Sequence, residues 1–153
     1  MNMITTPLPS ESARIESTSS ARSRVLIVED EAQIRQFMAR ALRRQAYEVE
    51  EVPDGEACIE RLRQGFEGII LMDIQMPGLS GWQTIEVLVK EGLLGRSLIC
   101  METGTGQPGQ DSAGLEEYIF DYLAKPFGIA ALRMMVENAA NYLRSEGTSD
   151  SEA

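Results

Sequence analysis

The residues best suited to chemistry in this sequence are acids and a lysine that follow short apolar runs. Glu29 and Asp30 come directly after one such run, and Asp73 comes directly after a second. Lys125 follows a third run, within the stretch DYLAKPF. A single acid at a loop end is usually a solvated surface group, but its recurrence after separate apolar runs favours a functional site.

These acids would repel one another if the fold brought them together. Two carboxylates about 5 Å apart repel by roughly 3 kcal/mol at an effective dielectric constant of about 20. A hard divalent cation with oxygen ligands compensates for that repulsion, and Mg²⁺ suits a site of one or two carboxylates with water. The sequence therefore predicts that Glu29, Asp30 and Asp73 hold Mg²⁺, with Lys125 as a second positive charge.

Short strands that alternate with amphipathic helices must position these side chains. The β-branched run at 25–28 is apolar on both faces, as a buried parallel strand is. Further strands are expected at 47–52, 68–72, 98–101 and 119–124, and helices at 34–42, 55–62, 81–90 and 132–143. This alternation predicts an α/β fold whose parallel sheet is covered on both faces, with ligands beyond the carboxyl ends of its strands.

Composition excludes several classes of function. The net charge of −10, without any cluster of Lys and Arg long enough to follow a phosphate backbone, argues against nucleic-acid and anionic-membrane partners. No apolar run has the roughly 18 residues of a membrane helix, and the first residues do not resemble a signal peptide, so we expect a cytoplasmic protein.

The absence of histidine removes Ser-His and Cys-His catalysis and His-ligated zinc. Cys58 and Cys100 lie in apolar segments and are interpreted as reduced core thiols.

The chain is expected to contain one domain between two tails. Residues 1–22 are rich in Ser, Thr and Pro and are predicted to form a disordered N-terminal tail. Residues 23–145 form the predicted domain, and residues 146–153 a disordered acidic C-terminal tail.

Three stretches of this sequence resemble the signature stretches of the bacterial response-regulator receiver domain. They read VLIVEDE, ILMDIQMPGLSG and DYLAKPF, and the resemblance covers about residues 23 to 145. The 30 residues from Asp73 to Thr103 and the 22 from Thr103 to Lys125 are also what this family leads us to expect. The resemblance implies a doubly wound sheet of five parallel strands in the flavodoxin-like order 2-1-3-4-5.

The resemblance also implies roles for individual residues. Asp73 would be the phosphoacceptor that takes a phosphoryl group from a partner's phosphohistidine. Mg²⁺ would be bound by Asp30, Asp73 and the backbone carbonyl of Gln75, with Glu29 acting on the metal through water. Lys125 would pair with a phosphoryl oxygen.

Further positions follow from the same resemblance. The hydroxyl of Thr103 would donate to another phosphoryl oxygen, and Tyr122 would change rotamer with phosphorylation. A partly buried strand aromatic is an alternative interpretation of Tyr122 that is compatible with this role. Gln75 and Thr105 would tune the rate of dephosphorylation.

The leading hypothesis is a single-domain response regulator that is not an enzyme beyond its own phosphorylation and dephosphorylation. A histidine kinase or histidine phosphotransfer protein would phosphorylate it, and it would signal to an unknown protein target. The alternative is a degenerate receiver that binds proteins without phosphorylation. An aspartyl phosphatase would need an acid two residues after Asp73, where this chain has Gln75.

Two features depart from the family pattern. The connection between the last two strands contains four glycines and Pro108, so we predict a shortened, displaced or mobile helix there. Glu102 occupies a position that is normally apolar. Either it is pushed to the strand edge, or the register is one residue off and Glu102 takes the place assigned to the Thr103 hydroxyl.

Overall fold

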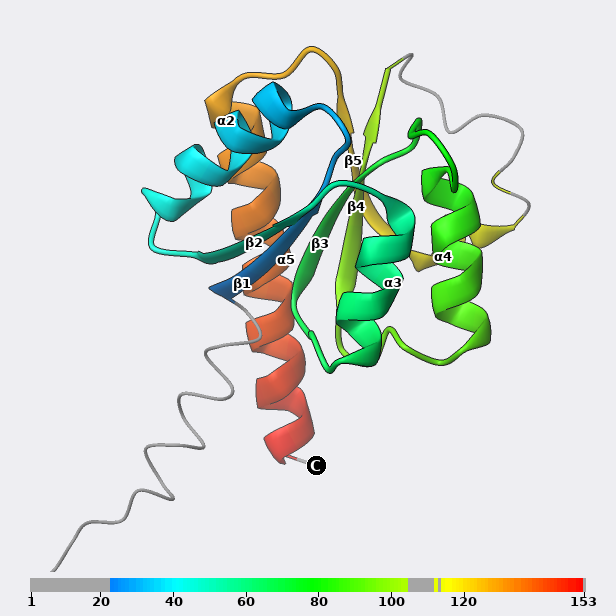
Figure 1. The fold of residues 1–153 in the computed structure, drawn as a ribbon. Helices are drawn as coiled ribbons and strands as arrows, with labels where there is room; N and C mark the ends of the chain where they lie inside the picture. The colour runs from blue at the N-terminus through cyan, green and yellow to red at the C-terminus, as the bar shows by residue number, and fades with distance from the viewer. Residues whose placement is uncertain (1–22, 105–111, 113, 153) are drawn as a thin grey trace, which may run out of the picture.

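The fold is a five-stranded parallel sheet between two layers of helices (Figure 1). The computed structural model describes residues 23–104, 112 and 114–152. The strands are β1 (Arg24–Val28), β2 (Glu48–Val52), β3 (Ile69–Asp73), β4 (Leu98–Thr103) and β5 (Ile119–Ala124). Their order is β2-β1-β3-β4-β5, and each neighbouring pair is parallel, which confirms the predicted fold class.

Four α-helices cover the two faces of the sheet. They are α2 (Ala32–Arg43), α3 (Gly55–Arg63), α4 (Gly81–Lys90) and α5 (Ile129–Glu152). Helices α2 and α5 lie on one face, and α3 and α4 lie on the other (Figure 1). None of the helices in the described part of the chain is long and apolar enough to cross a membrane.

The central strands divide their side chains between two apolar clusters because alternate residues of a strand point to opposite faces. Ile69 and Leu71 of β3 pack with α2 and α5, whereas Ile70 and Met72 pack with α3 and α4. All five residues of β3 are buried. The strand that ends in Asp73 therefore runs through the centre of the molecule and fixes that carboxylate at the sheet edge.

Helix α2 uses a narrower apolar face than its sequence suggests. Met38, Ala41 and Leu42 are buried, as their spacing predicts, but Phe37 remains 40% exposed. Phe37 therefore lies outside the buried face of α2. The buried face of α2 is centred on Met38, so the adjacent residue turns toward the rim of the helix.

Of the helix expected between β4 and β5, the described residues show only 3₁₀ conformation, at Ser112 and in one turn after it. This turn, η2, spans Leu115–Tyr118. Gly114 before it has φ +83°, a left-handed conformation that an α-helix through this point could not contain. A complete helix over 106–117 is thus excluded, while 105–111 and 113 lie outside the described residues.

The C-terminal end of the chain differs from its predicted boundary. Helix α5 continues to Glu152, although residues 146–153 were expected to form a disordered tail. No proline interrupts this segment, and a single glycine costs a helix only about 1 kcal/mol. The predicted N-terminal tail at 1–22 lies outside the described residues.

The two cysteines are buried and free, in agreement with their interpretation as core thiols. Burial raises the pKa of the Cys58 thiol to about 12. A thiol that stays protonated at neutral pH is a poor nucleophile and a poor metal ligand.

A close backbone approach fixes the loop that follows β3. Helix α4 begins with a capping box between Ser80 and Gln83, and the amide of Gly81 donates to the carbonyl of Ile74 at 2.7 Å. A Cβ atom at Gly81 would lie 2.6 Å from the carbonyl oxygen of Asp73 and 2.9 Å from Cα of Ile74. Both neighbours are backbone atoms, so neither can move away without displacing the end of β3.

We expect Gly81→Ala to lower the free energy of unfolding by about 1–3 kcal/mol, because the added methyl group overpacks this contact. Urea denaturation followed by the fluorescence of Trp82, the sole tryptophan, measures the change. Gly104→Ala is the control, since a Cβ there meets no atom of the described residues within 4 Å. Equal stabilities for the two variants would contradict this explanation.

Candidate functional site

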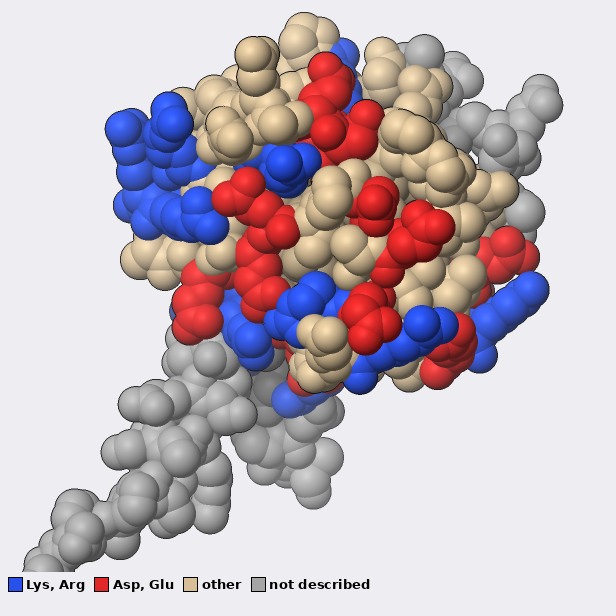
Figure 2. Space-filling view, in the orientation of Figure 1, with Lys and Arg blue, Asp and Glu red and all other residues tan. Residues whose placement is uncertain are grey.

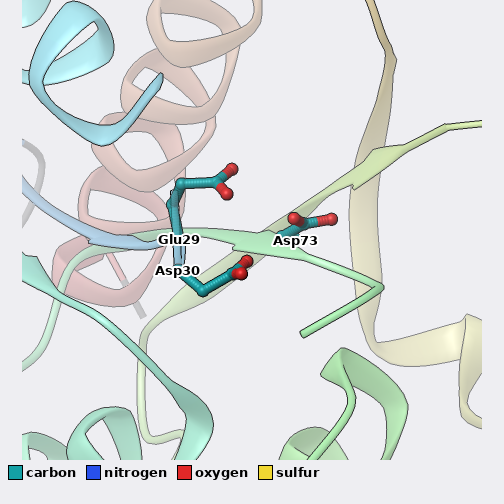
Figure 3. Close-up of side chains that lie close together, drawn as sticks. All are labelled: Glu29, Asp30 and Asp73. Atoms are coloured by element: carbon teal, nitrogen blue, oxygen red, sulfur yellow. The ribbon is translucent and has the colours of Figure 1, made fainter. Parts of the chain in front are cut away.

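Three carboxylates gather at the carboxyl ends of β1 and β3. Glu29 and Asp30 follow β1, and Asp73 is the last residue of β3 (Figure 3). One ligand atom from each residue lies within 4.8 Å of the others. Glu29 and Asp73 are buried, whereas Asp30 is half-buried, so the group is open to solvent on the side of Asp30. The structure thus brings together the three acids that the sequence analysis predicts.

Lys125 reaches into this group from the end of β5. Its Nζ lies 2.9 Å from Oδ2 of Asp73 and 3.6 Å from Oε1 of Glu29. Its backbone amide donates to the carbonyl of Thr103, which ties the end of β5 to the end of β4. Burial disfavours the ammonium ion, but the hydrogen bond and charge of Asp73 outweigh it, so the pKa of Lys125 lies above its usual value. Lys125 is therefore a fixed positive charge within the acidic group.

Backbone amides orient two of the carboxylates. The amide of Glu31 donates to Oε2 of Glu29 at 3.1 Å, and the amide of Gln75 donates to Oδ1 of Asp73 at 3.2 Å. Oε1 of Glu29 is buried and has no hydrogen-bond partner among the described residues. Burial is the main cause that raises the pKa of Glu29. The group therefore retains acceptor capacity that its own donors do not fill.

Glu102 adds a fourth acid to this region. In the β3–β4 ladder it lies opposite Asp73, and in the β4–β5 ladder opposite Leu123. Its side chain is fully buried, and neither carboxylate oxygen has a hydrogen-bond partner within the described part of the chain. Burial, and then the charges of Glu29 and Asp73, raise the pKa of Glu102 well above its usual value.

Neither sequence-based explanation of Glu102 describes its position. It is not pushed to the strand edge, because β4 is paired on both sides and the residue is inaccessible. Nor does it take the terminal place of Thr103, which remains the last residue of β4 and is 2% exposed. The signal for its true place is strand alternation: Glu102 is two residues from Cys100, which packs toward α2 and α5.

The other predicted site residues lie on or beside the same strand ends. Gln75 is in the loop after β3, where its amide contacts Asp73. Tyr122 is opposite Met101 in the β4–β5 ladder and is 37% exposed, so it lies at the surface. Thr105 lies outside the described residues.

A comparison with protein families identifies the family to which this chain belongs. The family model described as "Response regulator receiver domain" matches residues 25–137. The chain belongs to the response-regulator receiver family. The predicted resemblance is thereby confirmed, and the strand-end acids and Lys125 lie within the matched residues.

Solved structures with the same fold include other receivers. A CheY-like receiver domain protein from Methanospirillum hungatei is 32% identical, with a TM-score of 0.75, over 81% of this chain and 98% of that one. The chemotaxis protein CheY4 of Vibrio cholerae is 25% identical, with a TM-score of 0.69, over 76% of this receiver and 98% of that chain.

Curated relatives are transcriptional regulators that are longer than the matched region. The phosphate regulon transcriptional regulatory protein PhoB of Escherichia coli is 34% identical over 104 residues, which are 68% of this chain and 45% of PhoB. The transcriptional regulatory protein CutR of Streptomyces coelicolor is 36% identical over 109 residues, which are 71% of this chain and 49% of CutR. The chain thus spans about half the length of these relatives.

We expect Glu102→Gln to stabilise the receiver increasingly as pH rises above about 4.5. The folded state holds the Glu102 proton at pH values where the unfolded chain has released it, because its folded pKa is raised. Each pH unit in this range costs the wild type up to about 1.4 kcal/mol from this group, and glutamine does not titrate. Urea unfolding in EDTA at several pH values measures the difference.

The exposed Glu117→Gln is the control for this measurement. It should show no gain that grows with pH. If the advantage of Glu102→Gln were the same at every pH, the folded carboxyl would not be the group responsible.

Proposed function

We propose that this receiver is a phosphoacceptor switch, phosphorylated on Asp73 by a histidine kinase or histidine phosphotransfer protein. The observation that carries the proposal is the contact of Lys125 Nζ with Asp73 at 2.9 Å, beside two further carboxylates. A lysine paired with an acid alone would be an ordinary ion pair. The additional acids, with unfilled acceptor capacity, favour a site that binds a cation and a phosphoryl group.

The acidic group fits Mg²⁺ in both charge and ligand type. Its ligand atoms lie within 4.8 Å of one another, they are all oxygens, and one side of the group is open. Asp30, Asp73 and the backbone carbonyl of Gln75 would hold the ion, with Glu29 beside it. Bound Mg²⁺ would supply positive charge to offset the negative charge of a phosphoryl group near the carboxylates.

The residues of the chain would then support phosphoryl transfer by positioning and charge. A carboxylate oxygen of Asp73 attacks phosphorus, the bond from phosphorus to the donor's imidazole nitrogen breaks, and that nitrogen keeps the electron pair. The Asp73 side chain becomes an acyl phosphate. Lys125 pairs with one phosphoryl oxygen and the Thr103 hydroxyl donates to another. No general base is needed, because an attacking carboxylate has no proton to lose.

Signalling would follow from the change in charge at Asp73. Lys125 and Thr103 would shift toward the phosphoryl oxygens, and Tyr122, on the neighbouring strand, would change rotamer. Such a change biases a surface between two arrangements. The output we propose is binding to another protein in the cytoplasm.

Incubation with acetyl phosphate and Mg²⁺ should add one phosphoryl group to the wild-type chain, as measured by intact-protein mass spectrometry. Asp73→Asn should remove the adduct because the amide is a poor nucleophile. Lys125→Ala should reduce labelling strongly while preserving the fold. The same adduct on Asp73→Asn, or none on the wild type, would contradict the proposal.

The absence of an adduct on a folded wild-type protein would favour the phosphorylation-independent binding module. Two departures from the family pattern favour this alternative: the buried Glu102 and the short 3₁₀ turn before β5. Beryllofluoride, which mimics a phosphoryl group, separates the two functions. Its binding should require Mg²⁺ and Asp73 if the switch operates.

We expect Asp30→Asn to weaken Mg²⁺ binding by at least about tenfold, since it removes a charged oxygen ligand. Isothermal titration calorimetry with MgCl₂ measures the affinity. Glu31→Gln is the matched control, because Glu31 is an exposed acid next to the site but outside the acidic group. Similar losses in both variants would show that only the overall negative field attracts the ion.

A further inference from the structure

The buried acid Glu102 has no part in the chemistry proposed above. Figure 2 shows acidic side chains on the surface of the protein, many of them beside basic ones, where water also screens their charge. Glu102, in contrast, is 0% exposed, and neither of its carboxylate oxygens has a hydrogen-bond partner among residues 23–104, 112 and 114–152. Because an unpartnered buried polar group opposes folding, its two acceptor oxygens favour any donor that comes within reach.

Strand alternation places Glu102 on the same face of the sheet as the other charged groups of the site. Four strands each bury one residue in the apolar cluster beneath α2 and α5, namely Ile27, Leu71, Cys100 and Leu123. Two positions after each of these residues the chain has a charged one, in turn Glu29, Asp73, Glu102 and Lys125. Since side chains two residues apart along a strand point to the same face, all four charged groups are directed to the α2 and α5 side.

Lys125 crosses β4 to reach Asp73. The order of the strands is β3-β4-β5, so β4 lies between the strand that ends in Asp73 and the strand that precedes Lys125. Glu102 is opposite Asp73 in one ladder, and in the other it is opposite Leu123, two residues before Lys125. Glu102 therefore lies between the two partners of the 2.9 Å contact, on the face along which the lysine side chain runs.

The ammonium group of Lys125 has hydrogen-bond donors that the present contacts leave unused. It carries three N–H groups; Asp73 accepts one at 2.9 Å, and Oε1 of Glu29, at 3.6 Å, is beyond hydrogen-bond distance. Burial lowers the pKa of Lys125, but the nearby acids, Glu102 among them, raise it above its usual value. Glu102 thus attracts the ammonium group without forming a hydrogen bond to it in this structure.

Phosphorylation would change the balance between these acceptors. Once Asp73 is an acyl phosphate, the ammonium group is shared between the phosphoryl oxygens and the remaining buried acids. The oxygens of Glu102 are unfilled and shielded from water, and an interaction in such surroundings is stronger than one at the surface.

We infer that Glu102 is a positioning residue whose oxygens restrain Lys125 and so weaken the pairing of its ammonium group with a phosphoryl oxygen. This inference rests on the proposed function, since it concerns the lysine that pairs with the phosphoryl group on Asp73. An apolar residue at position 102 releases Lys125. Leucine is the suitable replacement, because the preceding residue on this face, Cys100, and the cross-strand neighbour, Leu123, both belong to the apolar core.

The test measures the affinity of the Mg²⁺-loaded protein for beryllofluoride by ¹⁹F NMR spectroscopy. Glu102→Leu should bind at least about fivefold more tightly than the wild type, because it removes the competing acceptor oxygens. Glu102→Gln should gain less than the leucine variant, since glutamine keeps an oxygen acceptor in the same buried place. Unchanged affinity in Glu102→Leu, or equal gains in the two variants, would overturn the inference.

A Lys125→Met background separates restraint of the lysine from other effects of Glu102. The gain from Glu102→Leu should disappear there, because the two residues act as one unit. A gain of the same size in that background would overturn the inference while leaving the proposed function intact. The comparison of leucine with glutamine retains Lys125, so it decides the question even if Lys125→Met does not fold.

Glu31→Gln is the matched control, because it removes one exposed acid beside the site. It should keep the wild-type affinity for beryllofluoride, and a gain equal to that of Glu102→Leu would contradict a role that acts through Lys125. A wild type that binds no beryllofluoride would overturn both the inference and the proposed function.

Discussion

The confinement of several carboxylates to one end of the sheet is the constraint on which the rest of the structure depends. Glu29, Asp73 and Glu102 are buried at or beside the ends of β1, β3 and β4. Lys125 is the cation that lies among them. Buried like charges oppose folding unless protons, cations or hydrogen bonds compensate. Two apolar clusters, packed against the two faces of the sheet, hold the strand ends in place despite this repulsion.

The same arrangement connects stability with function. The raised pKa values of Glu29 and Glu102 show that the folded protein retains protons in this region more readily than the unfolded chain does. Burial is the main cause of both shifts, and the charge of Lys125 acts against them by favouring the ionised carboxylates. The function proposed for Asp73 would therefore depend on buried carboxylates that lower the stability of the fold when neither protons nor cations compensate their charge.

On the surface outside the site, most charged side chains near β2 form ion pairs. Most acids and arginines near β2 neutralise one another, as Arg43 and Glu51 do. Arg40 and Arg44 on α2 are an exception, since they form no ion pair with any acid among residues 23–104, 112 and 114–152.

The sequence by itself determined the order of strands and helices, the family and the acids at the strand ends. These features are encoded locally, in hydrophobic periodicity and in short motifs. It did not determine that Glu102 lies buried opposite Asp73, that Phe37 faces outward, or that α5 continues beyond residue 145. Those outcomes depend on strand register and helix rotation, because only tertiary packing decides which side chains distant in sequence meet.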